Sequence, residues 1–268
     1  MAKPNDSNPI QPEAAPCSAF AKELAAVSPD SLSALLSDSR LDETHLYLLL
    51  ERKDLPGTFL QEVAKRRDLL RSYQIKRSVT FHPHVPRLTA LRLVRELYLM
   101  DLVKLSQSPL TAGDLQRVAE EQVISRLAQL PLGEKIALAK QASARVLGAL
   151  ISEGHARVSA PALNNPRLTE AQVLKVLTKE KLTADLLASL GRHPRWSVLP
   201  NVRLALLRHP HAPLELAPKL LSHLNLADLQ ALVKLKTIST AIRRHIEHEI
   251  SCRMSDARGN PVKDPPQE

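Results

Sequence analysis

A proline-anchored phrase recurs along this chain and fixes where its helices can begin and end. The stretch from Ala156 to Thr169 aligns with the stretch from Pro200 to Pro213 at a constant offset of 44 residues, so that Asn165-Pro166 falls on His209-Pro210. A third copy lies upstream, in Phe81-His82-Pro83-His84-Val85-Pro86. A fixed period of roughly 20 to 50 residues is typical of repeat proteins, in which one unit cannot bury its apolar face alone. The phrase therefore predicts an array of stacked units.

Each copy of the phrase combines a signal that stops one helix with a signal that starts the next. The residue before a proline is pushed out of the α region, so a helix must end ahead of the first proline of each copy. Three residues after that proline comes a second marker, which is Pro86, Thr169 or Pro213. Proline in the first turn and threonine at the N-cap both suit the start of a helix. We therefore expect a new helix just after each second marker.

The spacing of the copies predicts two helices and two turns per unit. A degenerate copy surrounds Leu130-Pro131, and the gaps between Pro83, Pro131, Pro166 and Pro210 are 48, 35 and 44 residues. The second helices of the units are expected near residues 97–105 with 115–127, then 144–152, 183–190 and 226–235. Thr183 and Asn225 have the side chains of N-cap residues and would begin the last two.

The composition favours an all-α fold. The chain has only 7 glycines and 3% aromatic residues, and strand-like runs of β-branched residues are hard to find. We expect helical repeats over residues 81–252, preceded by helices over 17–80 that form a leading repeat or a cap. One of these helices is expected to start at Thr58 and to carry Leu60, Val63, Leu70 and Tyr73 on one face. Residues 1–16 and 253–268 have the composition of disordered arms.

These two-helix units resemble HEAT-like and armadillo-like repeats. The cadence of Ala162-Leu163-Asn164-Asn165-Pro166 with Thr169, and of Leu206-Leu207-Arg208-His209-Pro210 with Pro213, is similar to the bacterial leucine-rich-repeat variant. The resemblance implies a right-handed α-solenoid. Proteins of these classes mostly bind other proteins, a minority bind nucleic acid, and one HEAT-like group removes alkylated bases from DNA.

Histidines accompany the phrase and raise the question of a metal site. His82-Pro83-His84 and His209-Pro210-His211 each hold two imidazoles, and His193 lies in a further copy of the turn. The ligand sets expected for zinc are absent, and an imidazole ahead of proline can instead meet the orphan carbonyls of a helix end. The segment from Ile242 to Cys252 carries His245, His248 and Glu249, which share helix faces but do not converge. We predict no metal and no cofactor.

Basic residues are concentrated ahead of the first clear copy. The net charge is +9, from 37 basic and 28 acidic residues. The cluster consists of Lys65, Arg66, Arg67, Arg71, Lys76 and Arg77. Glu62 and Asp68 can pair with members of the cluster, which fits a solvated helix face. Alternatively, these cations contact the phosphates of a nucleic acid.

A second candidate surface lies in the most regular units. It consists of Arg167, Arg195, Trp196 and Arg203, which a protein or peptide partner could contact. Trp196 among cations could also stack on a nucleobase, although packing between units is the more ordinary role of a tryptophan. Asp185 and Asp228 fit the first turn of a helix rather than a catalytic role. No phosphate-cradling glycine loop, serine elbow, CxxC pair or HExxH motif occurs.

These observations favour a non-enzymatic binding scaffold that presents a concave surface to a protein or peptide. The alternative is a basic solenoid that binds nucleic acid, and a glycosylase-like activity stays open. We expect a cytoplasmic protein, because Cys17 and Cys252 lie far apart, no signal peptide begins the chain, and no apolar run could insert into a membrane.

Overall fold

The computed structural model describes residues 31–256 except 37, 39–40 and 236–237. Every regular element in this part of the chain is a helix, which confirms the all-α prediction. The arm predicted over residues 1–16 lies outside the described residues. Of the tail predicted over residues 253–268, the first four residues belong to the last helix and the rest lie outside the described part.

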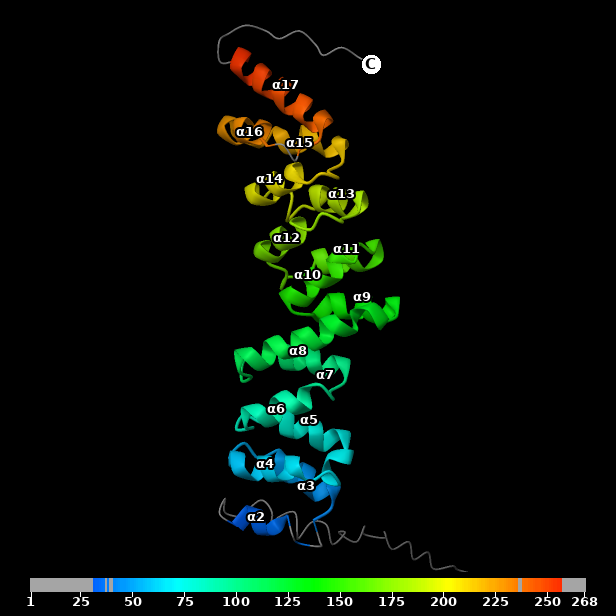
Figure 1. Ribbon diagram of the computed structural model, residues 1–268, viewed down its shortest axis with the longest axis vertical. Helices are drawn as coiled ribbons and strands as arrows, with labels where there is room; N and C mark the ends of the chain where they lie inside the picture. The colour runs from blue at the N-terminus through cyan, green and yellow to red at the C-terminus, as the bar shows by residue number, and fades with distance from the viewer. Residues whose placement is uncertain (1–30, 37, 39–40, 236–237, 257–268) are drawn as a thin grey trace, which may run out of the picture. The chain divides into compact units, whose positions relative to one another are not determined.

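The helices form two compact groups, one up to Ala119 and the other from Glu120 onward. The division falls inside α8 (Gly113–Arg126) rather than in a linker. The first group contains α2 (Leu32–Leu35), α3 (Glu43–Leu50), α4 (Gly57–Lys65), the 3₁₀ helix η2 (Leu69–Arg71), α5 (Tyr73–Phe81), α6 (Arg87–Val94) and α7 (Leu99–Gln107), drawn from blue to cyan-green in Figure 1.

The second group begins with the C-terminal half of α8. It continues with the 3₁₀ helix η3 (Leu127–Gln129), α9 (Leu132–Gln141), α10 (Ala144–Ser152), α11 (Ala156–Leu163), α12 (Glu170–Leu177), α13 (Ala184–Arg192), α14 (Pro200–Arg208), the 3₁₀ helix η4 (Leu214–Leu216), α15 (Ala217–Leu221), α16 (Leu226–Val233) and α17 (Thr240–Asp256). In this group, helices contact the element two positions further along the chain. One series runs α9, α11, α13, and the other runs α10, α12, α14, α16.

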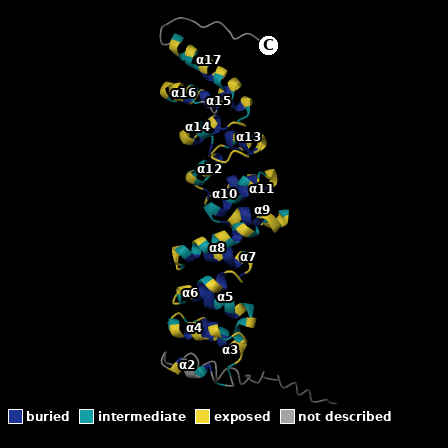
Figure 2. Ribbon diagram, in the orientation of Figure 1, coloured by how far each residue is buried: buried dark blue, intermediate teal, exposed yellow. Residues whose placement is uncertain are grey.

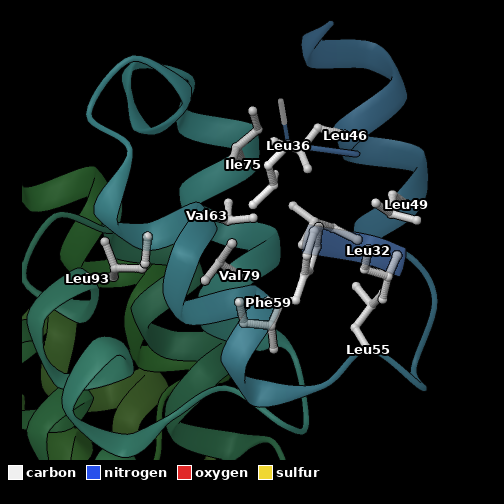
Figure 3. Packing of buried hydrophobic residues seen from close by; sticks show 13 residues of the cluster. Leu32, Leu36, Leu46, Leu49, Leu55, Phe59, Val63, Ile75, Val79 and Leu93 are labelled. Atoms are coloured by element: carbon white, nitrogen blue, oxygen red, sulfur yellow. The ribbon is translucent and has the colours of Figure 1, made fainter. Parts of the chain in front are cut away.

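Each helix has a buried face and an exposed face, as the alternation of blue and yellow along the ribbons in Figure 2 shows. In the first group, Leu32, Leu46, Phe59 and Val79, from α2, α3, α4 and α5, meet in one apolar cluster (Figure 3). A single short helix cannot bury its own apolar face. The burial of these faces between neighbouring helices therefore holds the stack together.

The stop and start signals of the phrase are confirmed. Helices α5, α11 and α14 each end just ahead of the His-Pro or Asn-Pro pair, and the next element begins directly after Pro86, Thr169 or Pro213. Thr169 accepts a hydrogen bond from the Gln172 amide at 3.4 Å. The expected second helices are also present, with Thr183 and Asn225 as N-caps whose side chains accept from the amides of Leu186 and Asp228.

The single helix expected from Thr58 is wrong. Helix α4 ends at Lys65, where Arg66 adopts an extended conformation (φ −80°, ψ 106°), and α5 begins only at Tyr73. The apolar residues keep a helical spacing across the break, because both helices and the 3₁₀ turn between them face the same core. Spacing alone therefore could not reveal the corner.

A ladder of side-chain hydrogen bonds ties the helix ends together. In four of the proline-containing turns, the residue ahead of the proline bonds an oxygen at or just past the C-terminal end of an earlier helix. His82 Nε2 lies 2.7 Å from the Arg52 carbonyl oxygen, and His209 Nε2 lies 2.9 Å from that of Lys179. Asn165 donates to the Ala139 carbonyl at 2.9 Å, and His193 Nε2 lies 3.2 Å from the Asn164 side-chain oxygen. His82 and His209 therefore meet main-chain carbonyls two residues beyond the ends of α3 and α12, whereas His193 meets a side-chain oxygen.

The same side chains also accept a hydrogen bond from the backbone two residues ahead. The amides of His84, Arg195 and His211 donate to Nδ1 of the preceding histidine at 3.2 Å, and the Arg167 amide donates to the Asn165 oxygen at 2.9 Å. With Nδ1 as the acceptor of the amide hydrogen, Nε2 is the ring nitrogen that donates to the oxygen near the other helix end. Asparagine reproduces both bonds without a titratable group.

We expect Asn165→Ala to lower the free energy of unfolding by about 1–3 kcal/mol, because it leaves the buried carbonyl of Ala139 without its donor. Urea denaturation followed by circular dichroism measures the change. The exposed Asn201→Ala is the control, and it should shift stability by less than about 0.5 kcal/mol. Equal effects of the two substitutions would contradict a structural role for the ladder.

The ladder also predicts acid sensitivity. Burial lowers the pKa of His82, and burial together with Arg195 lowers the pKa of His193. The unfolded chain, whose histidines titrate near a pKa of about 6.5, therefore binds more protons as the pH falls below that value, and the free energy of unfolding decreases. Thermal unfolding at pH 7.5 and 5.5 should show a smaller acid-induced loss in His82→Asn, with the exposed His155→Asn as the control. An unchanged loss in His82→Asn would refute the assignment.

Candidate anion-binding hollow

A hollow of about 440 Å³ lies in the first group, where α4 gives way to α5. We call it the basic hollow. Its lining consists of Ala64, Lys65, Arg67, Leu70, Arg71, Lys76, Arg92 and Glu96. Five of these residues are cationic and one is a carboxylate, so the hollow is strongly positive.

The break between α4 and α5 builds this hollow. Lys65 is the last residue of α4, and the chain then turns through Arg67 to reach Arg71 at the end of η2. Lys76 projects from the second turn of α5, and Arg92 comes from α6. On one continuous helix these cations would be distributed along the helix surface. The break between α4 and α5 instead places them around one hollow.

Some of these cations already have partners. Lys76 forms an ion pair with Glu96 at 2.7 Å, and Arg92 donates to the Ala64 carbonyl at the end of α4. Lys65, Arg67 and Arg71 are exposed and form no ion pair with any described residue. These three side chains are free to meet an anionic ligand.

The other two members of the predicted basic cluster do not line the hollow. Arg66 is the half-buried C-cap of α4. Arg77 donates to Asp101 at 3.0 Å, and its guanidinium lies 5.3 Å from the centre of the Phe81 ring. The structure therefore brings together Lys65, Arg67, Arg71 and Lys76, and it adds Arg92, which lies outside the predicted cluster.

The structure places Trp196 in the interior, at 1% exposure, which corrects its assignment to a partner surface. Its indole N–H donates to the Leu163 carbonyl at 2.9 Å. The Arg195 guanidinium lies 4.3 Å from the ring centre and donates to the carbonyls of Asn165 and Leu168. Trp196 therefore joins α11 to the segment after α13, and it cannot stack on a base.

Arg167 and Arg203 also bond backbone carbonyls. Arg167 donates to Gln141 at 2.8 Å, and Arg203 donates to Ser197 at 2.5 Å and to His223 at 3.5 Å. Lys, Arg and His side chains are favoured near helix C-termini because they neutralise orphan carbonyls. The sequence signal for an arginine that bonds main-chain carbonyls is its position directly after the proline of the turn, which Arg167 and Arg195 share.

The described residues contain no group of three or more His, Cys, Asp and Glu side chains placed to hold a metal ion. In α17, Cys252 Sγ lies 3.6 Å from His248 Nε2, and Glu249 pairs with Arg253 at 2.8 Å. Asp185 and Asp228 occupy the first turns of α13 and α16, as the sequence predicts.

No protein-family model, curated protein or solved structure matches this chain. Among the described helices, none is both long enough and apolar enough to cross a bilayer. Function is therefore proposed from the charge and geometry of the basic hollow.

The burial of Trp196 predicts its fluorescence. Because it is the one tryptophan of the chain, we expect a blue-shifted emission maximum and weak quenching by acrylamide. Loss of the bond to Leu163 in Trp196→Phe should lower the free energy of unfolding by roughly 1–3 kcal/mol. A red-shifted, easily quenched emission from the native protein would contradict the buried position.

Proposed function

We propose that this chain is a non-enzymatic binding protein that holds the phosphate backbone of a nucleic acid in the basic hollow. The observation that carries the proposal is the convergence of Lys65, Arg67 and Arg71, all without carboxylate partners among the described residues. Unpaired cations at an open concavity favour a polyanion, because each phosphate contact releases counterions.

We further propose that the helices form an α-solenoid of HEAT-like units. The alternating contacts of the second group support this arrangement, because a helix that packs against the second helix after it generates two parallel series. The ladder at His82, Asn165 and His209 supports it as well, since each of these side chains bonds a main-chain carbonyl at or just past the end of another helix. A repeat array of this kind needs no catalytic group in order to bind.

A protein or peptide partner is the second candidate, and exposed leucines favour it. Leu88 is 82% exposed and Leu110 is 72% exposed. They belong to neighbouring segments, because Arg87 pairs with Asp114 at 2.5 Å. Two exposed leucines cover a small area compared with a stable protein interface, so the basic hollow is the better supported site.

The proposal predicts salt-dependent binding that depends on three residues. The triple variant Lys65→Ala, Arg67→Ala and Arg71→Ala should bind an oligonucleotide more weakly. The slope of log affinity against log salt concentration should become less negative by about 2 to 3, because three phosphate contacts are lost. Fluorescence anisotropy at several salt concentrations measures both effects.

The matched control removes three exposed cations elsewhere, in Arg157→Ala, Lys181→Ala and Arg208→Ala. It changes the net charge equally but leaves the hollow intact. If the control weakens binding as much as the hollow variant does, binding depends on net charge rather than on the hollow. If the native chain fails to bind at low salt, the proposal is wrong.

A further inference from the structure

Two tyrosines stack beside the basic hollow. The rings of Tyr73 and Tyr98 lie with their centres 3.8 Å apart and their planes inclined by 19°. Tyr73 is half-buried, whereas Tyr98 is 64% exposed. One face of the Tyr98 ring is therefore supported by the protein, and much of the rest of the ring is open to solvent.

Hydrogen bonds fix the supporting tyrosine in place. The Tyr73 hydroxyl donates to the Asp101 carboxylate at 2.5 Å and accepts a hydrogen bond from the Tyr98 amide at 3.0 Å. Burial and the bond to Asp101 raise the pKa of Tyr73 to about 12, so its hydroxyl keeps the proton at neutral pH. Arg77 and Lys104 lie at 3.0 Å and 3.9 Å from Asp101, which offsets the charge of that carboxylate.

The stack lies next to the lining of the hollow. Tyr73 and Lys76 are three residues apart on α5 and so are neighbours on one helix face. Tyr98 follows Glu96 by two residues, and Lys76 pairs with Glu96 at 2.7 Å. The ion pair and the ring stack are thus successive contacts between α5 and the segment that follows α6.

This juxtaposition offers two kinds of recognition side by side. The free cations of the hollow suit phosphates, and an exposed aromatic face suits the π-face of a base. Bases inside a duplex are stacked on one another and cannot reach such a ring, whereas the bases of a single strand can.

We propose that Tyr98 is a stacking platform for an unpaired nucleobase, so that the ligand of the basic hollow is a single-stranded nucleic acid. This inference rests on the proposed phosphate binding and adds the class of ligand. Tyr73 is a positioning residue that holds the platform, and Tyr98 is the residue that touches the ligand.

The test compares three fluorescent ligands of equal length: an oligothymidine, an abasic oligonucleotide and a DNA duplex. Affinities of the native chain, Tyr98→Ala and Tyr98→Phe are measured by anisotropy at low salt. We expect Tyr98→Ala to bind oligothymidine roughly 5- to 100-fold more weakly, and to bind the abasic strand unchanged. Tyr98→Phe keeps the ring and should restore the affinity. Leu88→Ala, at a residue of the same group that is even more exposed than Tyr98, should have no effect.

The outcomes separate the two levels of the proposal. If the native chain binds all three ligands and Tyr98→Ala binds oligothymidine as well as the native chain does, the platform is refuted while phosphate binding stands. The same conclusion follows if Tyr98→Ala weakens the abasic strand as much as oligothymidine. If the native chain binds none of the three, phosphate binding itself fails, and the platform fails with it.

Discussion

The free carbonyls at helix C-termini are the constraint on which this structure depends. Helices of eight or nine residues leave about half of their carbonyls without an intrahelical partner. Here a side chain ahead of a proline supplies a donor at the end of another helix, as Asn165 does for Ala139 in the last turn of α9, or just past it, as His82 does for Arg52 two residues after α3. The proline that ends one helix therefore also positions the side chain that hydrogen-bonds near the end of another helix. One short sequence motif thus sets both the local chain geometry and a contact between helices.

The same demand explains much of the positive charge. Arg167, Arg195 and Arg203 each donate to main-chain carbonyls, and Arg253 donates to those of Leu221 and Leu224. Their acceptors lie at helix ends, as Gln141 and Leu221 do, or in the turns between helices, so the net charge of +9 overstates the charge available to a ligand. The cations that matter for binding are those that no carbonyl or carboxylate engages.

Features of the fold that are set by the adjacent residues could be predicted from the sequence, whereas features set by distant residues could not. Proline and the N-cap side chains at Thr169 and Thr183 act on the adjacent backbone, so the helix boundaries near them were predictable. The corner at Arg66 has no proline or glycine, and the apolar spacing continues across it. The basic hollow, which forms at this corner, could therefore not be predicted. The burial of Trp196 is also a tertiary property, because its donor reaches a carbonyl 33 residues away.

The position of α5 connects the ladder to the proposed site. At its C-terminal end, His82 bonds the carbonyl of Arg52, and at its N-terminal end, Tyr73 bonds Asp101. The helix that carries Lys76 is therefore held at both ends by hydrogen bonds to other segments of its group. Binding is stronger when the ligand need not order the site, because ordering side chains and loops costs free energy. A ladder that exists to complete helix ends thus also preorganises one wall of the hollow, which leaves only the exposed side chains of Lys65, Arg67 and Arg71 to be ordered by a ligand.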